Sequence, residues 1–141
     1  MSGPDGIVHC AAIAAPGTEL RTALDTLVAT GLGALIVVGD EERVSALADA
    51  GFELDAPFSA EGLCELCKMD GAVTLDAGVR RILRANVHLA PDRRLPTSET
   101  GIRHRTAEQL SRATDALVIA VSEQRGAITL YHRGERDVVT A

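Results

Sequence analysis

Residues 101–121 read GIRHRTAEQLSRATDALVIAV, a glycine and a run of cationic side chains followed by a helical pattern and then an apolar run. We expect a helix over residues 103–113 and a buried strand over residues 116–121. A continuous apolar strand beside a helix is typical of a sheet that is covered by helices. This stretch therefore predicts an α/β fold.

The remaining chain repeats the same two kinds of segment. One expected helix begins after Thr18 and ends before Gly31, a second covers residues 41–50, and a third begins after Ser59. The other expected strands are residues 33–38, 71–75, 79–89, 127–131 and 137–140. Residues 52–58, with Pro57, are expected to form a connecting segment, and residues 90–100 a loop.

Length and composition favour one domain. A chain of 141 residues can bury a core of its own, and 46% of the residues are apolar but only 2% are aromatic. The core must then consist of alanine, valine, leucine and isoleucine. We expect a single domain over residues 16–141 with a central mixed β-sheet flanked by helices, preceded by an N-terminal extension over residues 1–15 that is partly disordered or helical.

Charge and apolar runs exclude several classes of protein. The formal net charge of −6 argues against broad binding to nucleic acid or to an anionic membrane surface. No apolar run approaches the roughly 18 residues that span a bilayer. Residues 7–15 are apolar but follow no basic segment, so they do not resemble a signal peptide. Three cysteines cannot all pair within one chain, and we expect a cytoplasmic, reduced protein.

A cationic cluster opens the helix of residues 103–113. Arg103, His104 and Arg105 precede Thr106 and follow Gly101, which permits close approach of the backbone. The amino end of a helix presents unpaired N–H groups to anions, and arginine adds bidentate contacts to phosphate oxygens. The pattern predicts a phosphate site, although a solvated basic turn would show the same residues.

Two acidic turns are further candidates. Asp70 and Gly71 precede an expected strand, where a carboxylate can hold a divalent metal or orient a hydroxyl nucleophile. Ser122 and Glu123 follow the strand of residues 116–121, at an end of the sheet where ligands often bind. Glu123 is a candidate second metal carboxylate and Ser122 a candidate phosphate donor. Ordinary polar turns would also explain both pairs.

Other motifs give weaker signals. Cys64 and Cys67 form a single C-x-x-C on a helix with no second pair, so small buried side chains explain them better than zinc or redox chemistry. The sequence contains neither G-x-x-x-x-G-K-[ST] nor G-x-G-x-x-G, and P-loop and Rossmann folds therefore lack support.

From about residue 16 onward the chain resembles the diadenylate cyclase family, in particular the catalytic domain of the DNA-integrity scanning branch. The resemblance is carried by several segments: GTELRTALD (17–25), GALIVVG (33–39), ELCKMDGAV (65–73), ILRANVHLAPD (82–92), PTSETGIRHRTAEQLS (96–111) and VIAVSEQRGAITLYHRGER (118–136). It implies the condensation of two ATP molecules into cyclic di-AMP, with release of two pyrophosphates and with Mg²⁺ or Mn²⁺ as the cofactor.

The resemblance also implies roles for individual residues. Asp70 matches the acidic residue that engages the metal and the attacking ribose hydroxyl, and Arg103, His104 and Arg105 match the phosphate-binding motif. The implied nucleotide-binding positions are Gly71, Ala72, Leu89, Gly101, Ile102, Thr106 and Ser122, with Glu123 as a further metal candidate. One copy of these motifs per chain implies a homodimer or a higher homo-oligomer with active sites face to face.

Ile102 departs from the family pattern, which usually has threonine there. A lost hydroxyl costs around 1 kcal/mol where it would donate to a phosphate. An alternative is therefore a weakened module that binds ATP or cyclic di-AMP without turnover, and a third reading is an assembly partner of a longer cyclase. The helical and DNA-binding segments of the longer family members have no counterpart in this sequence, so DNA sensing is not expected of this chain.

Overall fold

The computed structural model, which describes residues 6–140, confirms the apolar run as strand β6 (Leu117–Val121), whose five residues are all buried. β6 pairs antiparallel with β1 (Ala34–Val38) on one side and with β7 (Ala127–His132) on the other. The most apolar segment of the chain thus lies in the interior of the sheet, where both faces of a strand are covered.

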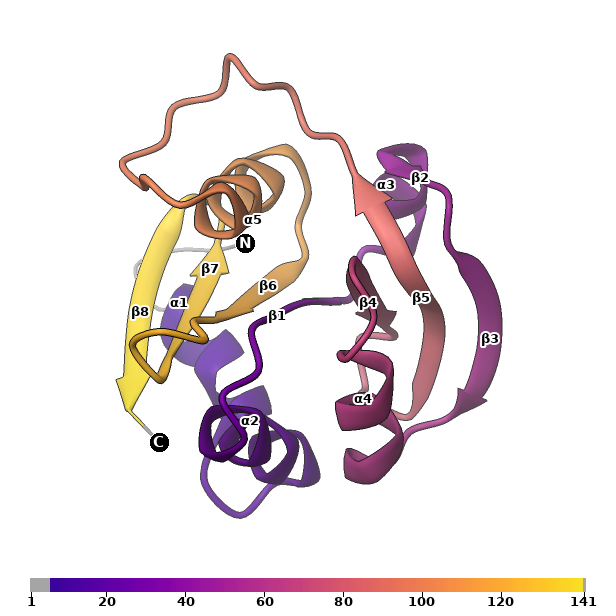
Figure 1. Cartoon of the computed structure of the whole chain (residues 1–141). Coiled ribbons are helices and arrows are strands. Elements are labelled where there is room, and N and C mark those ends of the chain that lie inside the picture. Colours follow the sequence, from indigo (N-terminus) through magenta and orange to yellow (C-terminus); the bar gives the residue numbers. More distant parts are fainter. Residues whose placement is uncertain (1–5, 141) are drawn as a thin grey trace.

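Eight strands form one mixed sheet in the described part of the chain (Figure 1). The order is β2-β5-β4-β1-β6-β7-β8, and β3 pairs with β5 outside this path. β1 runs parallel to β4 (Ala72–Leu75), whereas β5 (Arg81–Leu89) and β8 (Glu135–Thr140) pair antiparallel with their neighbours. The predicted α/β fold with a central mixed sheet is confirmed.

Helices cover both faces of this sheet. α2 (Glu19–Ala29) and α4 (Ala60–Leu66) pack on one face, together with α1 (Gly6–Ala11) and a 3₁₀ turn (Ala12–Ala14). α5 (Ile102–Ala113) covers the other face, as Figure 1 shows. Because side chains alternate along a strand, Leu117, Ile119 and Val121 of β6 join the core beneath α2, and Val118 and Ala120 join the core beneath α5.

Local capping explains where two helices begin. The hydroxyl of Thr18 accepts a hydrogen bond from the Arg21 amide at 3.1 Å, and the hydroxyl of Ser59 accepts one from the Gly62 amide at 3.0 Å. Both N-caps were expected from the sequence, since serine and threonine satisfy the free N–H groups of a first helical turn.

Two sequence expectations are wrong. The helix expected over residues 41–50 ends earlier, as α3 (Glu41–Ala46), and Ala48–Asp49 form the short strand β2, which pairs with the end of β5. Ala50 and Gly51 then adopt positive φ angles of 58° and 80°, which a helix does not tolerate. The expected connecting segment is strand β3 (Phe52–Pro57), which pairs antiparallel with β5.

The N-terminal extension is described in part. Residues 1–5 and residue 141 lie outside the described residues, whereas residues 6–14 form α1 and the 3₁₀ turn. In residues 6–140, none of the helices combines the length and the apolar character that crossing a bilayer requires.

The topology brings the candidate segments to one edge of the sheet. β1 and β4 are parallel, so Gly33 and Asp70–Gly71, which precede these strands, lie at the same edge. β5 and β6 run the opposite way, so their carboxyl ends meet this edge, with Val87 opposite Ala72 and Val121 opposite Ala34. The connection from β5 to α5 starts at this edge (Figure 1).

Candidate functional site

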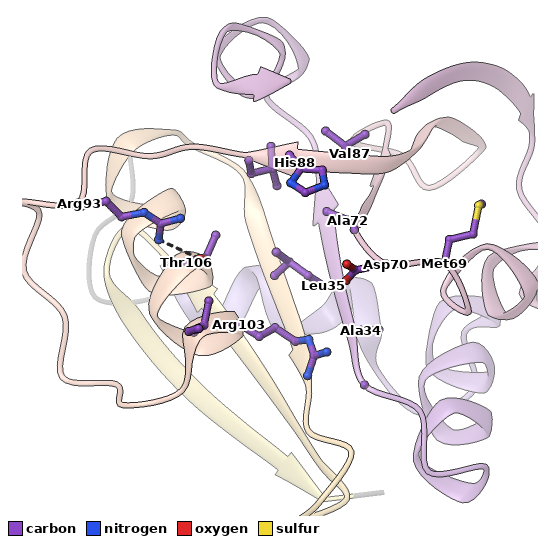
Figure 2. A pocket seen from close by; sticks show the side chains of 14 residues that line it. Ala34, Leu35, Met69, Asp70, Ala72, Val87, His88, Arg93, Arg103 and Thr106 are labelled. Carbon is purple, nitrogen blue, oxygen red and sulfur yellow. Dashed lines mark hydrogen bonds between the residues drawn. The ribbon is translucent and has the colours of Figure 1, made fainter. Parts of the chain in front are cut away.

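A cavity of about 500 Å³ opens at this edge, between the strand ends and the beginning of α5 (Figure 2). Its volume lies in the range of small-molecule sites, roughly 300–1,000 Å³. One part of its wall is apolar and includes Leu35, Val87 and Leu89. The polar lining comes from Asp70, His88, Arg93, Arg103 and Thr106.

Asp70 stands at the lip of this cavity, just before β4. Its side chain is exposed and makes no hydrogen bond or ion pair within residues 6–140. The next residue fixes this position, because Gly71 has a φ of 132° and a methyl group added there would lie 2.8 Å from the Asn86 carbonyl carbon. Only glycine fits so close to β5, so the backbone holds the Asp70 carboxylate at the cavity.

The amino end of α5 supplies the opposite wall. Gly101 is its N-cap residue and provides no side-chain cap, and the first turn contains no acidic residue. The first N–H groups of the helix and its positive dipole end are therefore available to an anion. Arg103 leaves this turn half-buried, and Figure 2 shows its side chain running toward the start of β1.

Thr106 lies one turn further along α5 and is 6% exposed. Its hydroxyl accepts a hydrogen bond from Nη1 of Arg93 at 2.9 Å, drawn as a dashed line in Figure 2. The oxygen is thereby occupied as an acceptor, which leaves the hydroxyl proton for a ligand in the cavity. Arg93 was not among the sequence candidates, because nothing in the local pattern distinguishes it from its neighbour Arg94.

A second cavity of about 400 Å³ adjoins the first and shares Ile102 and Arg103 with it. Gly101, His104, Ser122 and Glu123 line this second space. The structure thus brings Asp70, Gly71, Ala72, Leu89 and Thr106 to one cavity and the Ser122 turn to the adjacent one, with the start of α5 between them.

His104 is buried at the floor of the second cavity. Its ring meets Tyr131 edge-on, with ring centroids 6.5 Å apart, and its Nε2 has no hydrogen-bond partner in the described residues. Burial lowers the pKa of His104, and the guanidinium of Arg125 acts in the same direction. The carboxylate of Glu99 opposes this shift.

Glu99 connects the loop before α5 to the sheet. Its Oε2 accepts hydrogen bonds from the Tyr131 hydroxyl at 2.7 Å and from Arg136 Nη1 at 2.8 Å. Burial favours the neutral acid, but these two donors outweigh it and lower the pKa of Glu99. A carboxylate therefore faces His104 from the loop side. Glu99 too was missed, since its partners lie 32 and 37 residues away.

Three further candidates lie at the rim of the Asp70 cavity or outside it. Ile102 lies at the rim that the two cavities share, with 80% of its surface exposed. Glu123, in the exposed turn after β6, lines the second cavity, and Arg105 is exposed and lines neither. Consecutive helical residues point in different directions, which explains why Arg103 faces a cavity and Arg105 does not.

The described residues contain no group of three or more His, Cys, Asp or Glu that could hold a metal ion. Mg²⁺ and Mn²⁺ sites in nucleotide enzymes combine one or two carboxylates with substrate phosphates. The Asp70 carboxylate, which has no hydrogen bond or ion pair in the described part of the chain, fits that kind of shared site. Burial raises the pKa of Cys67 to about 12, so its thiol stays protonated at neutral pH, as expected of a buried structural cysteine.

Most of the chain is similar to known proteins. The family model "DisA bacterial checkpoint controller nucleotide-binding" matches residues 21–136. DNA integrity scanning protein DisA of Corynebacterium glutamicum (strain R) is 54% identical over 121 residues, which is 86% of this chain and 33% of that protein. The chain thus spans about a third of the length of this relative.

Two crystal structures resemble the fold. A hypothetical membrane spanning protein from Bacillus cereus has a TM-score of 0.76 and 32% identity over 87% of this chain and 62% of the other. A double mutant of DacA from Staphylococcus aureus has a TM-score of 0.72 and 27% identity over 87% of this chain and 85% of the other. With a family model matched over most of its length, the chain belongs to the DAC family of DisA-type nucleotide-binding domains.

Proposed function

We propose that this chain is a diadenylate cyclase domain, which condenses two ATP molecules into cyclic di-AMP and releases two pyrophosphates. One observation carries the proposal: the Asp70 carboxylate and the Arg103 guanidinium line the same cavity at the amino end of α5, and neither has a hydrogen bond or ion pair within residues 6–140. Phosphoryl transfer requires positioning and neutralisation of charge more than covalent chemistry, and these two groups supply both.

The triphosphate belongs at the start of α5. The free N–H groups of the first turn and the Arg103 guanidinium bind phosphate oxygens. The His104 imidazole and the Ser122 hydroxyl add donors from the second cavity, which both residues line. Gly101 and Ile102 border this region.

The adenosine belongs at the strand ends. Leu89 and the neighbouring apolar wall face the base, while Gly71 and Ala72 allow the ribose to approach the backbone beside Asp70. The Thr106 hydroxyl, with its oxygen held by Arg93, donates to the nucleotide. Apolar walls with a few converging polar groups are typical of nucleotide-sized sites.

The reaction follows from this placement. Asp70 accepts a hydrogen bond from the 3′-hydroxyl of the ribose and takes up its proton as the oxygen bonds to the α-phosphorus of the other ATP. The bond from that phosphorus to the bridging oxygen breaks, and pyrophosphate leaves with the electron pair. Asp70, with Glu123 as a further candidate, would hold Mg²⁺ or Mn²⁺, which would supply charge neutralisation. Repetition at the second nucleotide closes the ring.

Two chains are needed for this product. Each α-phosphate is attacked by the other nucleotide, but each chain carries one Asp70 and one Arg103. Two protomers facing each other across a two-fold axis supply one ATP each. The partners are thus ATP, cyclic di-AMP and a second copy of this chain.

The test is a product assay. The chain is incubated with ATP and Mn²⁺, and the products are separated by chromatography, with the same assay in Mg²⁺ and without metal. We expect cyclic di-AMP from the native chain and its loss in Asp70→Asn, which keeps the size of the side chain but removes its charge. Calorimetry should show that the variant still binds ATP, because the α5 contacts remain.

Asp137→Asn is the matched control, since Asp137 is an exposed carboxylate of β8 that lines neither cavity. This variant should retain the native rate. Full activity of Asp70→Asn would show that the catalytic carboxylate lies elsewhere.

A further inference from the structure

Gly33, directly before β1, lies against the guanidinium of Arg103. A methyl group added to Gly33 would be 2.5 Å from Nη1 and 2.8 Å from Cζ of Arg103. Attractive contacts with carbon lie near 3.5–4.0 Å, so both groups cannot occupy this space. The arginine head fills the volume that a side chain at position 33 would take.

The backbone itself does not require glycine at this position. Gly33 is not among the residues with positive φ, whereas Gly31, two residues earlier, has a φ of 72°. An alanine could therefore adopt the Gly33 conformation without strain. The absence of a side chain at position 33 instead leaves the space that the Arg103 guanidinium occupies.

Packing holds this arginine without consuming its donors. Arg103 makes no hydrogen bond or ion pair with any residue from 6 to 140, although it is half-buried and lines both cavities. A guanidinium carries five N–H donors in a rigid plane. The Arg103 head lies beside the Gly33 backbone, and its donors remain available to phosphate oxygens.

We propose that Gly33 is a positioning residue for nucleotide binding, whose missing side chain seats the Arg103 guanidinium at the mouth of the Asp70 cavity. This inference rests on the proposed function, in which Arg103 binds the triphosphate. It adds a residue from a different element, the start of β1, to the binding machinery of α5.

The proposal predicts that a side chain at position 33 affects ATP binding but not folding. Alanine at this position would displace only the end of the flexible Arg103 side chain, and the fold should tolerate that displacement. Alanine at position 71 would instead meet the backbone of Asn86, in a conformation with a φ of 132° that alanine rarely adopts. Gly33→Ala should therefore fold like the native chain, whereas Gly71→Ala should not.

The test is a double-mutant cycle on ATP affinity, measured by calorimetry with Gly33→Ala, Arg103→Ala and the double variant. We expect Gly33→Ala to weaken ATP binding at least about tenfold, the size of a lost charge-assisted contact, with an unchanged melting temperature. In the Arg103→Ala background, Gly33→Ala should change the ATP affinity by less than about twofold, because the guanidinium that it would displace is already absent.

Gly78→Ala is the matched control. Gly78 also has no positive φ and also faces an arginine, but an added methyl would lie 3.6 Å from Nε of Arg80, an ordinary contact. Native affinity of Gly33→Ala, an equal loss with and without Arg103, or a failure of Gly33→Ala to fold would each overturn the inference. A lack of cyclic di-AMP from the native chain would contradict the proposed function alone, since this cycle measures binding.

Discussion

Ile102 places an apolar side chain at the rim that the two cavities share, with 80% of its surface exposed. It adds no donor to the first turn of α5. We expect Ile102→Thr to tighten ATP binding and raise the product rate by about fivefold, because one hydroxyl donor to a phosphate contributes around 1 kcal/mol. Stability should change by less than about 0.5 kcal/mol, since the position is exposed. Calorimetry, the product assay and thermal denaturation measure these effects.

Ile102→Val separates shape from the hydroxyl, as valine is branched like threonine but cannot donate. It should resemble the native chain. An equal gain in both variants, or none in Ile102→Thr, would exclude a missing donor at this position.

Burial lowers the pKa of His104, and the Glu99 carboxylate acts against this shift. Among the groups that act on this imidazole, the Glu99 carboxylate raises its pKa, whereas burial and three guanidinium groups, those of Arg125, Arg103 and Arg136, lower it. A negative charge favours the imidazolium form. We expect Glu99→Gln, which keeps an acceptor for Tyr131, to lower the pKa of His104 further. Titration of the histidine signals by NMR measures the shift.

Glu135→Gln is the control, because Glu135 is exposed on β8 and is not among the groups that shift His104. It should leave the titration unchanged. A His104 pKa that rises or stays the same in Glu99→Gln would show that this carboxylate does not act on the ring.

Sequence reasoning selected residues whose chemistry is visible locally, and it passed over residues whose contacts depend on distant partners. Asp70 and Arg103 stand out by charge and by neighbouring turns. The role of Gly33 depends on a side chain 70 residues away, and that of Glu99 on strands β7 and β8. Such contacts follow from sheet order, which no local pattern contains.

Among the larger elements, the loop of residues 90–100 is held to α5 by buried side chains. Gln109 is fully buried, and its Nε2 donates to the carbonyls of Arg93 and Leu95 at 3.1 and 3.0 Å. The carboxylate of Glu108 accepts from the Thr97 hydroxyl at 2.6 Å. This face of α5 therefore fixes the loop that carries Arg93 to the cavity.

Gln109→Met tests this anchoring. Methionine has a similar size but leaves the two loop carbonyls without their donor, which should lower the free energy of unfolding by about 1–3 kcal/mol. Urea denaturation measures the change through the midpoint. Gln124→Met, in the exposed turn after β6, should have little effect. An unchanged midpoint in Gln109→Met would show that the loop is held by other contacts.

The elements differ in how plainly the sequence predicts them. β6 and β1 are apolar because both of their faces are buried, and helices α2 and α4 begin at hydroxyl caps. β3 was missed because its residues are mostly exposed and it contains Pro57 at its end and a positive φ at Asp55. Its pairing with β5 defines it as a strand, and a single-sequence pattern does not show that pairing.

Taken as a whole, the chain would supply one half of the symmetric reaction proposed above. Its site opens at a sheet edge, beside the exposed Ile102, and each copy holds one Asp70 and one Arg103. A product with two equivalent halves then requires two copies that face each other. A separate chain should bind ATP without closing the ring.

The rate of cyclic di-AMP formation per chain, measured over a dilution series at saturating ATP, tests this requirement most directly. Association of two copies depends on concentration. We expect the rate per chain to fall steeply below the concentration at which sedimentation shows the dimer to dissociate, while ATP binding per chain stays constant. A rate per chain that is independent of dilution through that range, or no cyclic di-AMP at any concentration, would contradict the proposal that two copies of the chain form the product.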